Sequence, residues 1–499
     1  MPVLLKIEET QFSDGSISDK QLNPVVNDES TPTVTKKSKY ARKHIIRKEK
    51  RLTGDANTLT EFEVTSLIKY CHKYIEHDFN SLLLTMLITG RNLELLLDQN
   101  IKFLIDNTKL ELSCAGFFII NWKFPKHHIP ANFEHMLDRP TSNGVVVIPK
   151  ELTSLLKSHR DSEHDFKVIE SSVSKTIDKI NQEYSIRLTL KRVRLYLDHS
   201  KARFNISELD YAYIAGENIR YHPASYYTLF CNQELVDKQK SFCDEMFTKA
   251  GVPLLTFPSK RTQKTMGSRM VLKDQFIREY FDLLLNKIDL ANSSAENIKE
   301  RHNLYTILTI DVLQICTLHR PVKGIFKDMN HFDFQFSTAL IEDKGSKSIR
   351  RLPLARIGLQ FLNAYLKYLG KLKENVQYVT PSIYNEIDDI LKGKKGIFQI
   401  MDQERLFEAN PKKNIASILN GWFPFPPNWH RHKMATVLKQ QNVNDELIAC
   451  FMGHETKLDH SLSQYSALSF GDLTQVSMQI DKYLRETLLV RTVPVFYRK

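Results

Sequence analysis

The chain has 499 residues, of which 42% are hydrophobic and 26% charged, as is typical of a globular protein with two to four domains. A net charge of +12 favours nucleic acid over a membrane as partner, with simple solubility as the alternative. No hydrophobic run approaches the roughly 20 residues that a bilayer requires. Residues 1–16 are too acidic for a signal peptide, so we expect a cytoplasmic protein that is nucleoid-associated when bound to DNA.

The first predicted segment, residues 1–57, is a disordered basic arm. Its stretch 36–51 holds nine Lys and Arg residues against one Glu. Such a run is usually a solvated tail, and beside a nucleic-acid domain it contacts phosphates without reading sequence. The residues expected to make these contacts are Lys36, Lys37, Lys39, Arg42, Lys43, Arg47 and Lys48.

Residues 58–230 are predicted to form the first domain. Helical apolar spacing begins near Leu59, and residues 78–104 indicate a buried helix, a turn at Gly90 and a second short helix. Strand-like runs follow at 116–123 and 145–149, and helices continue to about residue 230.

Residues 231–299 are predicted to be a helical bridge, with helices near 233–250 and 273–288 around a basic linker. The pattern then restarts in a domain over 300–488, with a buried helix, a turn and a second short helix. Residues 337–354 indicate a β-hairpin, helices follow, and 489–499 form a tail. The expected fold is therefore mainly α with a small antiparallel β-sheet, an α+β class.

The intervals between matching residues in the two predicted domains indicate an internal duplication. Arg194 and Gly216 are 22 positions apart, and so are Arg431 and Gly453. A tyrosine follows each glycine, and an arginine closes each buried helix. These further residues are Tyr226 or Tyr227 and Arg91 in the first copy, and Tyr465 and Arg320 in the second.

The second copy resembles the catalytic domain of the tyrosine recombinases, the phage-integrase family, from about residue 300 to 470. The resemblance rests on an arginine after the long helix, a lysine on a hairpin, an HxxR-like stretch, a Gly-His pair and a terminal tyrosine. The matching residues are Arg320, Lys344 (or Lys347), Asn428, Arg431, His454 and Tyr465. The resemblance implies tandem recombinase-like domains and cleavage through a 3′-phosphotyrosyl DNA intermediate, without metal or nucleotide cofactor.

Phosphodiester chemistry calls for these residue types. Charge grows on the non-bridging oxygens during attack, and two arginines bind such oxygens with planar, permanently charged forks. A histidine adds a donor, a lysine protonates the departing 5′ oxygen, and the tyrosine attacks. The six cysteines are scattered, and the sequence has no phosphate loop and no metal-ligand spacing. We therefore expect reduced thiols and no cofactor.

Both copies depart from the family pattern. Asn428 stands where the family has histidine, and His430 and His432 are expected to point away from its face. In the first copy Lys191 and Glu217 replace the two histidines, and Lys123 is only a candidate hairpin lysine. The first copy is thus interpreted as a diverged domain that binds DNA. The segment after Tyr465 is expected to form a helix that docks on a neighbouring protomer or on its own chain.

Three functions remain open from the sequence. The first is a site-specific recombinase or integrase acting on double-stranded DNA as a homo-oligomer, a dimer or tetramer, with accessory recombination proteins as further partners. The second is a DNA-binding accessory protein that keeps this fold without the reaction. The third is an enzyme of the type IB topoisomerase kind, which shares the chemistry.

Overall fold

The structure is a computed structural model of the chain. It describes residues 57–76, 79–97, 116–119, 129, 131–140, 145–161, 165–217, 226–257, 265–291, 297–320, 326–342, 349–403, 405–419, 422–453 and 468–493. Residues 53–499 form one compact unit built around two hydrophobic clusters. Within the described residues no helix is both long and apolar enough to cross a bilayer.

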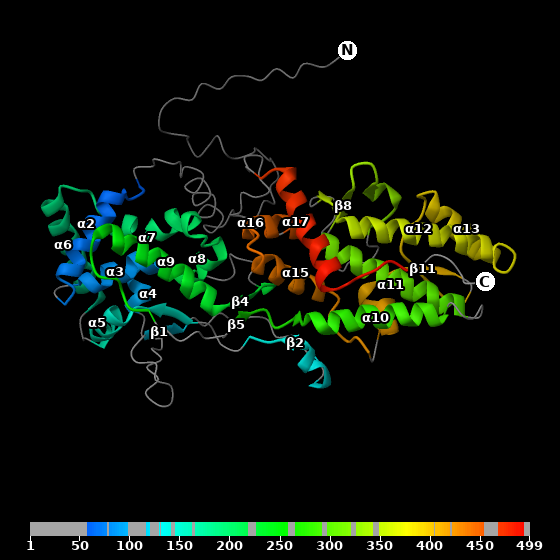
Figure 1. Cartoon of the computed structure of the whole chain (residues 1–499), viewed down its shortest axis with the longest axis horizontal. Coiled ribbons are helices and arrows are strands. Elements are labelled where there is room, and N and C mark those ends of the chain that lie inside the picture. Colours follow the sequence, from blue (N-terminus) through cyan, green and yellow to red (C-terminus); the bar gives the residue numbers. More distant parts are fainter. Residues whose placement is uncertain are drawn as a thin grey trace, which may run out of the picture. The chain divides into compact units, whose positions relative to one another are not determined.

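The first cluster is formed by the helices of the N-terminal half together with α9. The helices are α2 (Glu61–Lys73), α3 (Asn80–Thr89), α4 (Leu93–Leu97), α5 (Lys150–Asp161), α6 (Phe166–Tyr184), α7 (Leu190–Ser200), α8 (Glu208–Ala215) and α9 (Asn232–Ala250), with a short 3₁₀ turn at Lys201–Phe204 (Figure 1). Another 3₁₀ turn, Ala131–Met136, packs against the second cluster described below. Their ends carry the expected signals. Thr60 and Ser207 form capping boxes, and Gly90, Gly216 and Gly251 end helices in the left-handed conformation.

The second cluster is formed by the helices that follow. They are α10 (Asp274–Ala291), α11 (Ile298–Thr317), α12 (Arg356–Val376), α13 (Pro381–Leu391), α14 (Ala416–Leu419), α15 (Trp429–Gln440), α16 (Asp445–Met452) and α17 (Phe470–Lys482), with short turns of other helix types at Met329–His331, Pro411–Ile415 and Tyr483–Thr487. The bridge predicted from the sequence is thus divided: α9 packs in the first cluster and α10 in the second.

The sheets are small and antiparallel, and the prediction of a mainly helical α+β fold agrees with the structure. One sheet pairs β7 (Phe332–Asp333), β8 (Thr338–Glu342) and β9 (Ile349–Pro353), so the predicted hairpin is present. The other pairs are β1 (Gly116–Ile119) with β3 (Val145–Ile148), β2 (Leu137–Asp138) with β6 (Val271–Leu272), β4 (Leu229–Cys231) with β5 (Thr265–Gly267), and β10 (Gln399–Met401) with β11 (Leu406–Glu408).

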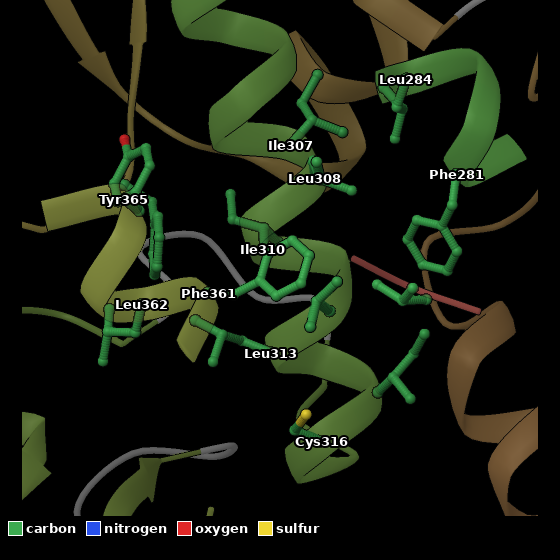
Figure 2. Close-up of a cluster of buried hydrophobic side chains, with 14 of the residues drawn as sticks. Phe281, Leu284, Ile307, Leu308, Ile310, Leu313, Cys316, Phe361, Leu362 and Tyr365 are labelled. Carbon is green, nitrogen blue, oxygen red and sulfur yellow. The ribbon is translucent and has the colours of Figure 1, made fainter. Parts of the chain in front are cut away.

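Each cluster has a helix buried on every side. All ten residues of α3 are buried, and so is every residue of α11 from Arg301 to Thr317. Figure 2 shows the apolar side chains of α11 lying between those of α10 and α12. Asn303 on α11 is fully bonded, since its amide bonds the backbone of Met401 in both directions at 3.0 and 2.7 Å. The continuous apolar runs read from the sequence therefore correspond to central helices.

The backbone repeats over the span that carries the 22-residue spacing. Asn205 and Asn442 are both left-handed, Ser207 and Asn444 both cap the helix that follows, and Gly216 and Gly453 both end it in the left-handed region. The members of each pair are 237 positions apart, as are Arg194 and Arg431. Strained and capping positions recurring in one register are evidence that the two spans share one local structure.

The repeated helices α8 and α16 contact each other, and a buried ionic cluster joins them. Lys439 Nζ lies 3.0 Å from Asp445 Oδ2 and 3.1 Å from Asp210 Oδ1, and it also contacts Ser207. The backbone N–H of Leu209 donates to Asp445 at 3.2 Å. The contact therefore joins equivalent ends of two equivalent helices.

Helix α17 packs on its own chain. Val476 and Ile480 are buried in the second cluster, and the Asp481 carboxylate accepts a bond of 2.6 Å from the backbone N–H of Ile357. Of the two arrangements expected for this segment, the structure has the self-packed one.

Candidate functional site

The site is built around Arg431 on α15. The helix begins at Trp429, whose ring packs edge-on against Phe423 with centroids 5.7 Å apart and is 3% exposed. This anchor fixes the first turn of α15, and Arg431 lies on that turn with none of its surface exposed. An arginine buried so completely must satisfy its donors inside the protein.

Arg431 binds the backbone of two other segments of the chain. Its guanidinium donates to the backbone carbonyl of Leu318 through Nη1 and to that of Met452 through Nη2, the latter at 3.1 Å. Leu318 follows the end of α11 and lies two residues before Arg320. Met452 ends α16 and lies two residues before His454. The segments that lead to Arg320 and His454 are therefore held on one guanidinium.

The β8–β9 hairpin also contacts the end of α16, next to the residue that Arg431 binds. Arg350 on β9 donates from Nε to the carbonyl of Phe451 at 3.2 Å. A Cβ on Gly453 would lie 2.8 Å from Cζ of Arg350, and the φ of Gly453 is +65°. The backbone conformation therefore favours glycine here, and a larger residue would also have to displace the guanidinium of Arg350. This is the residue that immediately precedes His454.

The turn before Arg320 is also fixed. Leu318 adopts a left-handed φ of 48°, and the carbonyl of His319 accepts a bond of 2.8 Å from Nε2 of His430. Burial lowers the pKa of His430 to about 3, and the nearby charge of Arg431 acts in the same direction. His430 is thus neutral and acts as a support for this turn, while Arg320 remains partly exposed.

The expectation that His432 points away from Asn428 is wrong. Nε2 of His432 lies 3.2 Å from Nδ2 of Asn428, because residues four apart share a helix face. The amide N–H₂ can only donate, so Nε2 accepts and the neutral ring carries its proton on Nδ1. Nδ1 then donates to Oγ of Ser268, 2.7 Å away. A histidine therefore stands beside the asparagine that replaces the expected one.

Tyr227 is a member of this site that we did not expect from the sequence. Its ring lies 5.1 Å from Cζ of Arg431 and 4.7 Å, centroid to centroid, from the ring of His432. The next residues hold it there, since the N–H of Leu229 donates to Oγ1 of Thr436 at 3.0 Å. The sequence had only offered Tyr227 as an alternative to Tyr226 for the first copy. The one signal was its place in the pair Tyr226-Tyr227.

The first copy places its candidate residues differently. Arg91 is 2% exposed, and its Nε donates to the carbonyl of Ile214 at 2.8 Å, close to Gly216. Burial lowers the pKa of Arg91 to about 10. Lys191 and Glu217 are exposed, Arg194 is half-buried, and Tyr226 packs against the first cluster. Arg91 thus supports the end of α8 from the inside.

The ends of α3 and α11 show which residues of the two copies are equivalent. Gly90 follows α3 as Leu318 follows α11, and both are left-handed. In this register Arg91 is equivalent to His319, and Asn92 is equivalent to Arg320. Asn92 uses its side-chain oxygen to accept the N–H of Leu95 at 2.9 Å. The first copy therefore lacks an arginine at the position equivalent to Arg320.

Several predicted residues lie outside the described ranges: Lys123, Lys344, Lys347, His454, Tyr465 and the arm residues of segment 36–51. In the part of the chain that the structure describes, no group of three His, Cys, Asp or Glu side chains is arranged to hold a metal ion. Comparisons with protein-family models, with curated proteins and with solved structures each found no match.

Proposed function

We propose that the chain is a tyrosine-type site-specific recombinase that cuts and rejoins duplex DNA through a phosphotyrosyl intermediate. The observation that carries the proposal is the convergence on Arg431. The carbonyls of Leu318 and Met452 bind its guanidinium, and Arg350 of the hairpin bonds the neighbouring Phe451. Arg320 and His454 each lie two residues after one of these anchored points, and the hairpin turn lies just before Arg350 in the sequence.

In this proposal each element has a defined task. Arg320 and Arg431 neutralise charge on the phosphate, His454 adds a donor, and Lys344 on the hairpin turn protonates the leaving oxygen. Tyr465 attacks phosphorus, and the phosphodiester energy is kept in the protein–DNA bond. Asn428 donates to a phosphate oxygen with one hydrogen of its amide, and His432 accepts the other and so positions that amide. The protein acts as a dimer or tetramer on two duplexes, aided by the basic arm.

A second function has its own supporting observation. Arg431 is fully buried, two of its bonds go to backbone carbonyls, and the ring of Tyr227 covers it. These are the contacts of an arginine that supports the fold. The alternative is therefore a DNA-binding accessory protein without cleavage activity.

The test is covalent capture on DNA. The target site is unknown, so the substrate is a pool of duplexes with randomised sequence and a nick that lets the cleaved end diffuse away. Denatured protein is recovered and its linked DNA sequenced. We expect an adduct with wild type and with Tyr226→Phe, and none with Tyr465→Phe.

Other outcomes have definite meanings. An adduct lost in Tyr226→Phe and kept in Tyr465→Phe would assign the chemistry to the first copy. Salt-sensitive DNA binding by wild type without any adduct would support the accessory protein and refute the enzyme. Relaxation of any supercoiled plasmid would point to the topoisomerase reaction.

A further inference from the structure

A cavity of about 250 Å³ lies beside the first turn of α15. One wall is α11, and the others come from the segment 411–429, which is rich in proline and aromatic residues. Phe423, Phe425 and Trp429 are the aromatic residues of its lining, and Asp311 and Gln314 are its polar side chains on α11. No described lysine or arginine lines it. Such walls suit a flat, uncharged ring.

Gln314 is the residue of this cavity whose side-chain amide a ligand could satisfy. Its side chain is 1% exposed, and its Nε2 has no hydrogen-bond partner among the described residues. An unsatisfied buried amide costs about 1–3 kcal/mol. Asn303 on the same helix shows the usual solution, since both ends of its amide are bonded to Met401. Gln314 lines a cavity in which a ligand can supply such a partner.

Asp311 lies one turn earlier on the same face of α11. Its carboxyl accepts a hydrogen bond from the hydroxyl of Tyr280, and burial raises its pKa to about 7. The carboxyl is thus engaged by Tyr280, and at pH 7 it is about half ionised. An anionic ligand finds no counter-charge among the described lining residues, and a cationic one meets only a half-ionised carboxyl that is already bonded to Tyr280.

We propose that this cavity binds a small planar lactam, a ring with adjacent C=O and N–H groups. A primary amide and a lactam form two antiparallel hydrogen bonds, which would satisfy Gln314 whichever way its amide is turned. The ring would stack against Phe423, Phe425 and Trp429. A dry apolar cavity of roughly 150 Å³ accepts benzene, so this volume accommodates one six-membered ring and its substituents.

A ligand bound in this cavity would lie close to the segments that carry the arginines of the candidate site. The cavity's wall α11 ends two residues before His319 and three before Arg320, and its residue Trp429 lies two before Arg431. A bound ring therefore touches α15, which carries Arg431, and α11, which ends three residues before Arg320. The inference does not depend on the proposed DNA chemistry, because binding is measured without DNA.

The probe is 2-pyridone, with toluene as a ring of similar size that lacks the amide edge. Binding to the full chain is followed by ligand-detected NMR titration and by the shift in Tm. We expect saturable binding of 2-pyridone, weakened about tenfold or more in Gln314→Leu, which removes the paired amide. Toluene binding is expected to be unchanged in Gln314→Leu, and the exposed control Gln275→Leu should alter neither.

The variant is suited to the test because it is expected to fold. Replacing an unsatisfied buried amide with an apolar side chain of similar size leaves the Tm unchanged or raises it. The proposal is overturned if wild type shows no saturable binding of 2-pyridone. It is equally overturned if Gln314→Leu, folded as judged by its Tm, binds 2-pyridone as tightly as wild type.

Discussion

Lys439→Met should uncouple the two halves of the protein. The ammonium group lies within 3.1 Å of both Asp210 and Asp445, and all three side chains are less than a tenth exposed. Asp210 keeps the ion pair with Lys238 at 2.7 Å after the change. Asp445 keeps the backbone N–H of Leu209 and loses its cation. The variant therefore leaves one buried carboxylate without a counter-charge.

Removing one partner of a buried ion pair typically costs about 3–5 kcal/mol. Because Lys238 remains, we expect about 3 kcal/mol for Lys439→Met. The matched control is Lys240→Met, which breaks the half-exposed pair with Asp244 on α9 and should cost about 0.5 kcal/mol or less. Urea unfolding measures both, followed by tryptophan fluorescence and by circular dichroism.

The pH dependence gives a second readout. Burial raises the pKa of Asp210, but the charges of Lys439 and Lys238 outweigh it and hold that pKa below its ordinary value. The stabilisation is therefore present above the unfolded pKa of about 3.9 and is lost as the pH falls through the lower folded value. The difference in free energy of unfolding between wild type and Lys439→Met should therefore become smaller below about pH 4. The reasoning is refuted if Lys439→Met costs no more than Lys240→Met.

Three further predictions follow from single contacts. Gly251→Ala, at φ +65° with open space around it, should cost about 1 kcal/mol by urea unfolding. Gly453→Ala, at the same φ, should cost about 1 kcal/mol more, because the guanidinium of Arg350 must move and lose its bond to Phe451. Asp311→Asn should gain stability over wild type as the pH rises from about 4 to 8. Because the folded protein holds the Asp311 pKa at about 7, wild type loses up to about 4 kcal/mol of folding free energy once the unfolded carboxyl ionises. A difference in free energy of unfolding between variant and wild type that stays constant with pH would contradict this. Tyr227→Phe should keep the ring on Arg431 and retain adduct formation. Tyr227→Ala should lower the free energy of unfolding by about 2–3 kcal/mol and reduce adduct formation. Loss of the adduct in Tyr227→Phe would show that the hydroxyl is needed.

The features that sequence reasoning predicted well are those determined by local pattern. The fully buried helices α3 and α11 follow from runs of apolar residues, and the β8–β9 hairpin from alternation. The equal spacing from Arg194 to Gly216 and from Arg431 to Gly453 reappears as matched caps and left-handed residues. Such signals lie within one stretch of chain, so they can be read without knowing the tertiary contacts.

The features that were missed depend on long-range contacts. The packing of Tyr227 on Arg431 joins residues about 200 positions apart, and no periodicity encodes it. Arg91 matched a sequence motif, yet its side chain is buried against Ile214, because the turn after α3 places it one position earlier than Arg320. The misjudged face of His432 was an error of helix geometry, since a separation of four residues returns to the same side.

The contact between α8 and α16 joins equivalent ends of equivalent helices, as a homodimer interface can, but its contacts are not reciprocal, because Lys439 corresponds to Ala202. Here both partners belong to one polypeptide. The linker holds them at an effective concentration that is typically millimolar, so their pairing is independent of dilution. A pairing inside one chain also removes the requirement that both sides be identical. One half can keep Gly453 followed by histidine while the other has Gly216 followed by glutamate, and every molecule contains one of each.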